Sequence, residues 1–105
     1  MSWTYLVIAG ILEVIFAYVL KQSEGFTRLL PSVMTLLTGL GSFWLLSLAM
    51  RTIPMGTAYI IWTGIGAVGA FITGIVFLGE TMTSLRAIAA IFIVMGLILM
   101  KLASS

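Results

Sequence analysis

Four long apolar stretches, separated by short polar segments, fill most of this 105-residue sequence. They cover about residues 3–20, 31–50, 57–78 and 85–102. A helix of roughly 20 apolar residues crosses the hydrocarbon core of a bilayer, which is about 30 Å thick. The stretches are continuous and lack the alternation that marks transmembrane β-strands. The sequence therefore predicts an all-α membrane protein with four transmembrane helices per subunit, in a single domain over residues 1–105.

Charged and turn-forming residues separate the apolar stretches. The segment 21–25 combines charge with glycine, and segments 54–56 and 79–81 form shorter connections. Glu24 and Glu80 fall in these connections, and we expect water to solvate both. The uninterrupted part of the fourth stretch, 87–100, would be only about 21 Å long as a helix. Arg86 and Lys101 at its ends can reach to the membrane interface and cover the difference.

The residue types that are missing exclude several kinds of chemistry. The sequence has no Cys and no His, and only 8% of its residues are charged. It therefore lacks disulfides, a thiolate nucleophile, an imidazole base and the usual ligands of zinc and haem. Its five basic residues are scattered, which argues against a nucleic-acid partner. We expect neither an enzyme nor a bound metal or cofactor.

The size and charge of the chain bear on its assembly. Four helices are too few to enclose a roomy aqueous path, so a transport function would need a second copy. If the N-terminus faces the cytoplasm, Arg51 and Lys101 lie inside and Lys21, Arg28 and Arg86 lie outside. A clear excess of Lys and Arg normally sets orientation. The near balance predicts that copies insert either way up, although one charge near a span end could still decide it.

Glu13 lies near the middle of the first apolar stretch, at a depth of roughly 15 Å. Placing an ionisable group at that depth costs about 2.5–3.5 kcal/mol on insertion scales. Such residues face the protein interior and commonly serve transport or proton relay. Glu13 is therefore the predicted proton- and substrate-binding residue. The alternative is a protonated carboxyl that only bonds to a neighbouring helix.

Neighbours of Glu13 in sequence and depth complete a candidate site. Gly10 and Phe16 lie three positions from Glu13 and share its helix face. Gly10 leaves space there for a ligand, or equally for a closely packed helix. Ser42, in the middle of the second span, can donate to the carboxylate and orient it. It can instead bond to its own helix backbone.

The third span adds aromatic and flexible positions. Tyr59 and Trp62 are three residues apart, so they share a helix face that can contact a cation or donate to a carboxylate. An interfacial aromatic belt is the alternative, although Trp62 lies well inside the span. Gly64 and Gly66 follow, and they can act as a hinge or as a close-packing surface.

The fourth span offers a surface for a second copy. Ala89 and Gly96 lie seven residues apart, with no charge between them. Small residues at this spacing permit close helix contact in a membrane. We therefore assign this helix to contact between subunits.

Several motifs together resemble the small multidrug resistance family. They are Glu13 within Leu-Glu-Val, the segment 23–28 that leads to Pro31-Ser32, the run 42–46, and above all residues 54–59 continuing through 62–66. The resemblance covers essentially the whole chain. It implies an antiparallel, dual-topology homodimer in the bacterial inner membrane that exports small cations in exchange for protons by alternating access. Glu13 of both copies would form the shared proton and substrate site.

The resemblance also implies roles for the other candidates. Ser42, Tyr59 and Trp62 match the family's binding-site positions, and Ala89 and Gly96 fall where its fourth helix packs across the dimer. Several positions are similar to those of the subtype that exports guanidinium ions. They are Gly10, Ala17, Ala67, Lys101 and the run 62–66.

Two positions depart from the guanidinium subtype. Phe16 stands where that subtype usually has Trp, and Gly39 replaces a larger residue. The first change removes an indole donor, and the second is expected to enlarge the pocket. Export of guanidinium is thus the leading expectation, and export of quaternary ammonium and other lipophilic cations is the alternative. A structural membrane subunit that transports nothing is the rival from another class.

Overall fold

The computed structural model describes residues 1–103, which form four helices. They are α1 (Ser2–Gln22), α2 (Leu29–Ala49), α3 (Met55–Leu78) and α4 (Ser84–Ala103). All four are long and apolar enough to cross a membrane, which confirms the predicted all-α, four-span fold class. The helices extend slightly beyond the apolar stretches. For example, α2 begins at Leu29, since Pro31 falls in its first turn, where a backbone N–H has no helical partner.

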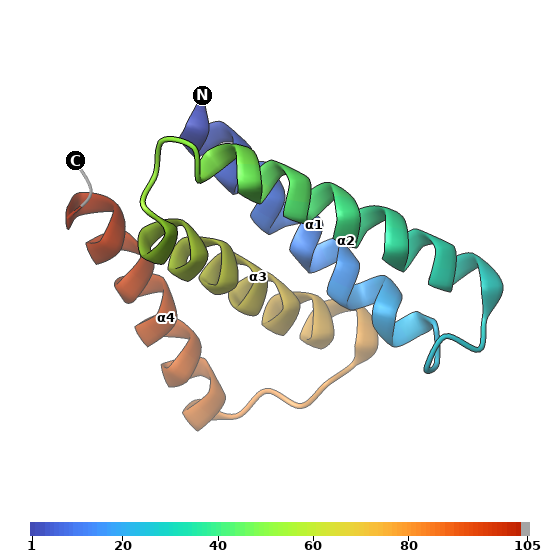
Figure 1. Ribbon diagram of the computed structural model, residues 1–105. Coiled ribbons are helices and arrows are strands. Elements are labelled where there is room, and N and C mark those ends of the chain that lie inside the picture. Colours follow the sequence, from blue (N-terminus) through green and yellow to red (C-terminus); the bar gives the residue numbers. More distant parts are fainter. Residues whose placement is uncertain (104–105) are drawn as a thin grey trace.

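The helices form a flat unit with α1 at its centre (Figure 1). The Cα atoms extend 42 × 34 × 16 Å. α1 packs along α2 on one side and along α3 on the other, whereas α2 and α3 barely touch. Over the described residues α4 packs mainly against α3, diverges from it toward the start of α4 (Figure 1), and has no buried residue. An extended linker, residues 79–83, carries the chain from α3 to α4 (Figure 1).

The buried core lies toward the end of the unit where α1 begins. It joins the first half of α1, the last half of α2 and the start of α3, through Leu6, Ala9, Leu46, Ala49, Ile53, Ala58, Ile61 and Trp62. At this end the ammonium of Lys101 lies 4.1 Å from the centre of the Trp3 ring, a cation–π contact that ties α4 to α1. The core is densely packed at this end, and hollows remain between α1 and α3 toward the other end.

Glycines set the close approach of α3 to its neighbours. A Cβ atom at Gly66 would lie 2.6 Å from Glu13 Cγ, and one at Gly69 would collide with Val14. A Cβ at Gly64 would collide with Leu97 of α4. α3 is one unbroken helix through these positions. The structure thus supports the close-packing alternative for Gly64 and Gly66, while their role as a hinge stays a prediction.

Candidate functional site

The Glu13 side chain lies in a groove between α1 and α3. The groove has a volume of about 400 Å³, and its walls are formed by Glu13, Ala17, Tyr59, Trp62, Thr63, Gly66, Ala67 and Ala70. Glu13 is partly buried, with its Cγ against the bare backbone of Gly66. Three predicted site residues, Glu13, Tyr59 and Trp62, therefore meet in one open groove. Among the described lining residues Glu13 alone carries a charge.

Hydrogen bonds join α1, α2 and α3 beside the groove. The indole N–H of Trp62 donates to Ser42 Oγ at 2.9 Å, and the Ser42 hydroxyl donates to the carbonyl of Ala9 at 2.7 Å. In an α-helix the carbonyl of residue 9 also accepts the amide of residue 13. The chain of bonds thus fixes α1 at the turn that carries Glu13. All of these side chains except Glu13 are buried.

This network corrects one expectation from the sequence. Ser42 and Trp62 were expected to donate directly to the Glu13 carboxylate. Each has a single polar hydrogen, and both hydrogens are used within the network. In this conformation the two side chains position the α1 backbone and do not hold the carboxylate.

Aromatic rings line one end of the site. The ring of Trp62 is flanked by Tyr59, with centroids 5.5 Å apart, and by Phe43 of α2, with centroids 5.6 Å apart. Trp62 is only 7% exposed, whereas Tyr59 is 53% exposed. Both rings line the groove, and Tyr59 is the more exposed of the two. Phe43 thus packs against Trp62 from α2 and does not itself line the groove.

Phe16 and Gly10 do not line the groove. A Cβ atom at Gly39 of α2 would lie 2.9 Å from the Phe16 ring, so the ring covers the space that a larger residue at 39 would take. The expectation that Gly39 enlarges the pocket is therefore wrong, because Phe16 fills the gap. A Cβ at Gly10 would lie 2.6 Å from Ile65 Cγ2, which closes the predicted ligand space and favours the packing alternative.

Ala89 and Gly96 lie on α4, away from the Glu13 groove. Both are exposed in the single chain, and a Cβ at Gly96 would meet open space. Their predicted role in contact between subunits stays a prediction. Gly64 packs against this helix, and Gly66 packs against Glu13.

The sequence interpretation missed several groove residues. Thr63, Ala67 and Ala70 line it together with Gly66. The signal was present, because positions 59, 63, 66, 67 and 70 recur at intervals of three and four and so share a helix face. Ala17, four residues after Glu13, was named only for its similarity to the guanidinium subtype, and it also lines the groove.

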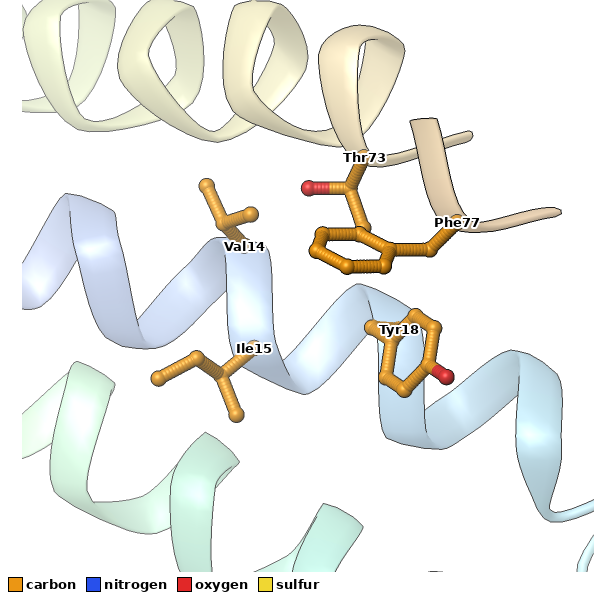
Figure 2. Close-up of a pocket in the computed structure, with 5 residues that line it drawn as sticks. All are labelled: Val14, Ile15, Tyr18, Thr73 and Phe77. Atoms are coloured by element: carbon orange, nitrogen blue, oxygen red, sulfur yellow. The ribbon is translucent and has the colours of Figure 1, made fainter. Parts of the chain in front are cut away.

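A second hollow lies toward the far ends of α1 and α3 (Figure 2). It has a volume of about 290 Å³ and is lined by Val14, Ile15, Tyr18, Thr73 and Phe77. The Tyr18 and Phe77 rings meet edge to face at 6.3 Å and 68°. No charged side chain lines it among the described residues. The acidic groove is thus the better candidate for a cation.

The described residues offer no conventional metal site. Within residues 1–103, no three His, Cys, Asp or Glu side chains come together to hold an ion. The chemistry of the groove rests on one carboxylate and the rings and hydroxyls around it. Such a site can bind a proton or a small organic cation.

Comparison with known proteins places the chain among transporters. The model of the family described as Small Multidrug Resistance protein matches residues 1–98. Proteins named guanidinium exporter from Escherichia coli (strain K12), Salmonella typhimurium and Citrobacter freundii are each 54% identical to it over 104 residues, which is 99% of both chains. These relatives are named as exporters rather than enzymes, as the composition predicts. With four apolar helices and bacterial relatives, the protein is a multi-pass protein of the inner membrane. The chain belongs to the small multidrug resistance family.

Proposed function

We propose that this protein exports guanidinium and related small guanidinyl cations in exchange for protons. The observation that carries the proposal is the Glu13 carboxylate, which lies in an open groove midway along a membrane-spanning helix. The relatives named guanidinium exporters, at 54% identity, support the choice of substrate.

The groove provides what binding of a guanidinium ion requires. Guanidinium is planar and carries several N–H donors, which pair with a carboxylate through short charge-assisted hydrogen bonds. Tyr59 supplies a ring against which the cation can lie. The small residues Ala17, Ala67 and Ala70 leave room for the ion. A proton and a cation neutralise the same carboxylate, so each excludes the other, and this exclusion couples their movements.

A second copy of the chain would complete the pathway. A single flat unit leaves the groove open at its side, and α4 presents an unburied apolar surface. We propose an antiparallel homodimer in which α4 packs on its counterpart and the two Glu13 residues share one site. Alternating access would then expose this pair to one side of the membrane at a time.

A substrate series tests the proposed function. Purified protein in liposomes is expected to give currents with guanidinium, and much smaller ones with tetramethylammonium, which has no N–H donor for the carboxylate. Equal or larger tetramethylammonium currents would favour the quaternary ammonium exporter, which would use ring and carboxylate contacts without directional hydrogen bonds. A protein that carries neither ion would be a structural subunit.

The antiparallel arrangement predicts a specific cross-linking pattern. The sequence has no Cys, so introduced thiols report only on the chosen positions. In an antiparallel α4 pair, position 89 of one copy lies opposite position 96 of the other. A mixture of Ala89→Cys and Gly96→Cys proteins should therefore form a disulfide-linked dimer, which needs Cα atoms about 4.4–6.8 Å apart.

The single variants serve as the control for that experiment. Each alone should cross-link poorly, because like positions would lie roughly 10 Å apart along the helix axis. Strong cross-linking of each variant alone, with no increase on mixing, would indicate a parallel pair. Gel mobility without and with a reductant measures both results.

A further inference from the structure

A second carboxylate, Glu80, lines a hollow next to the groove that holds Glu13. Next to the Glu13 groove is a hollow of about 320 Å³ between α1 and α3, and it shares Ala17, Ala67 and Ala70 with that groove. Its lining extends to Thr73, Gly74, Leu78 and Glu80. The two hollows are therefore adjacent, and each is lined by one carboxylate.

The turn after α3 directs Glu80 back over the helix. Gly79 adopts a left-handed conformation, with φ of 67°, and the Glu80 amide donates to the carbonyl of Gly74 at 3.0 Å. The Gly79 amide donates to the same carbonyl, so both residues after α3 cap the helix at Gly74. Although Glu80 is an exposed loop residue, as expected, its carboxylate lies against Gly74, where any Cβ atom would collide with Oε1. Glycines at 74 and 79 therefore hold the acid at the groove.

The spacing of the two acids follows from their positions along α3. Glu13 lies against Gly66 and Glu80 against Gly74. Eight residues of helix separate these glycines, which is about 12 Å. The residues that the two hollows share are alanines, and the nearby hydroxyls of Tyr18 and Thr73 line the outer part. A small cation would meet no basic group in the two hollows among the described lining residues.

The hollow lined by Glu80 is negative for two reasons. The last carbonyls of α3 carry the partial negative charge of a helix C-terminus, and the Glu80 carboxylate adds a full charge beside them. The basic residue nearest in sequence, Arg86, donates to the carbonyl of Thr81 at 2.7 Å and lines the crevice between α3 and α4 instead. A carboxylate placed beside helix carbonyls is stabilised by a cation.

We infer that Glu80 forms an outer binding site for small organic cations at the mouth of the α1–α3 groove, and that this site feeds the Glu13 site. The inference rests on the proposed export function and adds a second site to it. The ligand class is a cation with N–H donors, such as guanidinium, which bonds to the carboxylate in direct contact with water. A bound ion there would be about 12 Å of helix from Glu13.

Transport kinetics give the first test. Glu80→Gln should raise the guanidinium concentration for half-maximal exchange by about threefold to fivefold, as expected for an exposed charge, and leave the maximal rate unchanged. Raising the ionic strength should slow wild-type exchange at low guanidinium and have little effect on Glu80→Gln, because salt screens exposed charges. Gly74→Ala keeps the charge but displaces the carboxylate, so it should raise the half-maximal concentration in the same direction.

Glu24→Gln is the matched control. Glu24 lies in the loop between α1 and α2 and lines neither hollow. Its substitution by Gln removes the same charge as Glu80→Gln does. It should behave as wild type. Equal effects of Glu24→Gln and Glu80→Gln would indicate general surface charge and overturn the inference, as would wild-type kinetics in Glu80→Gln.

Carboxyl labelling tests the outer site without transport. In the Glu13→Gln protein, guanidinium should slow carbodiimide labelling of Glu80 and leave labelling of Glu24 unchanged, as read by mass spectrometry. Protection of Glu80 in a protein that fails to transport would support the outer site even if the export proposal failed. Equal labelling of Glu80 with and without guanidinium would overturn the outer site, whatever the currents show.

Discussion

Glu13→Gln is expected to abolish guanidinium–proton exchange. Glutamine keeps the size of the side chain but carries no charge and no titratable proton. A hydrogen bond to a charged group contributes about 1.5–3 kcal/mol, so losing two would weaken guanidinium binding by about 100-fold or more. Exchange driven by a pH gradient should vanish as well, because no group at this site can then carry the proton. Currents and pH changes in liposomes measure both effects.

Glu13→Asp and Glu24→Gln serve as comparisons for Glu13→Gln. Glu13→Asp keeps the carboxylate on a shorter side chain, so it should retain part of the exchange with a shifted pH dependence. In the wild type, lowering the pH should raise the guanidinium concentration needed for half-maximal exchange, because protons compete for the same oxygens. Glu24→Gln should leave exchange intact. Full guanidinium currents from Glu13→Gln would contradict the central role of this carboxylate.

Gly66→Ala is the second substitution with a large expected effect. The added Cβ would lie 2.6 Å from Glu13 Cγ, closer than two carbon atoms can approach without bonding. Glu13 has few other rotamers in a helix, and leaving the present one would turn its carboxylate away from the groove. We expect guanidinium affinity and exchange to fall at least about tenfold. Equilibrium binding and initial exchange rates measure the two quantities separately.

The comparison of binding with rate distinguishes packing from a hinge. If Gly66 matters because Glu13 lies on it, the affinity falls. If Gly66 acts mainly as a hinge, binding stays and only the rate falls. Gly56→Ala provides the control, since a Cβ there meets nothing within 4 Å, and it should resemble wild type. Wild-type affinity in Gly66→Ala would contradict the packing role.

Gly69→Ala separates a general packing defect from an effect on the acid. Its Cβ would collide with Val14, whose branched side chain is stiff. Overpacking of this kind costs about 1–3 kcal/mol. The stability of this variant should fall, while the pH dependence of its remaining exchange stays as in wild type.

The helices and the central acid could be predicted from the sequence because each depends on local properties. Continuous apolar runs define the spans, and a lone carboxylate at mid-span stands out by its desolvation cost. The observed helix ends differ from the predicted span ends by a few residues. For α2 the shift follows from Pro31, which the first turn of a helix accommodates.

The relations between helices could not be predicted in this way. Whether Trp62 donates to Glu13 or to Ser42 depends on the rotation of three helices about their axes. Phe16 and Gly39 were interpreted as two independent changes, but they compensate one another across α1 and α2. Glu80 was assigned to a solvated loop, and only the left-handed turn at Gly79 brings its carboxylate back over α3.

The isolated position of α4 also bears on how such a protein is synthesised. α4 leaves the ribosome last, when α1, α2 and α3 can already have packed together, and within the described chain it packs mainly against α3. A newly inserted subunit that must pair then exposes this helix to lipid until a second copy diffuses to it. Pairing is bimolecular, so doubling the density of new subunits shortens the time that each one waits for a partner by about half. A weakly expressed gene would leave unpaired chains exposed to membrane proteases for longer, which links the yield of transporter to the rate of translation.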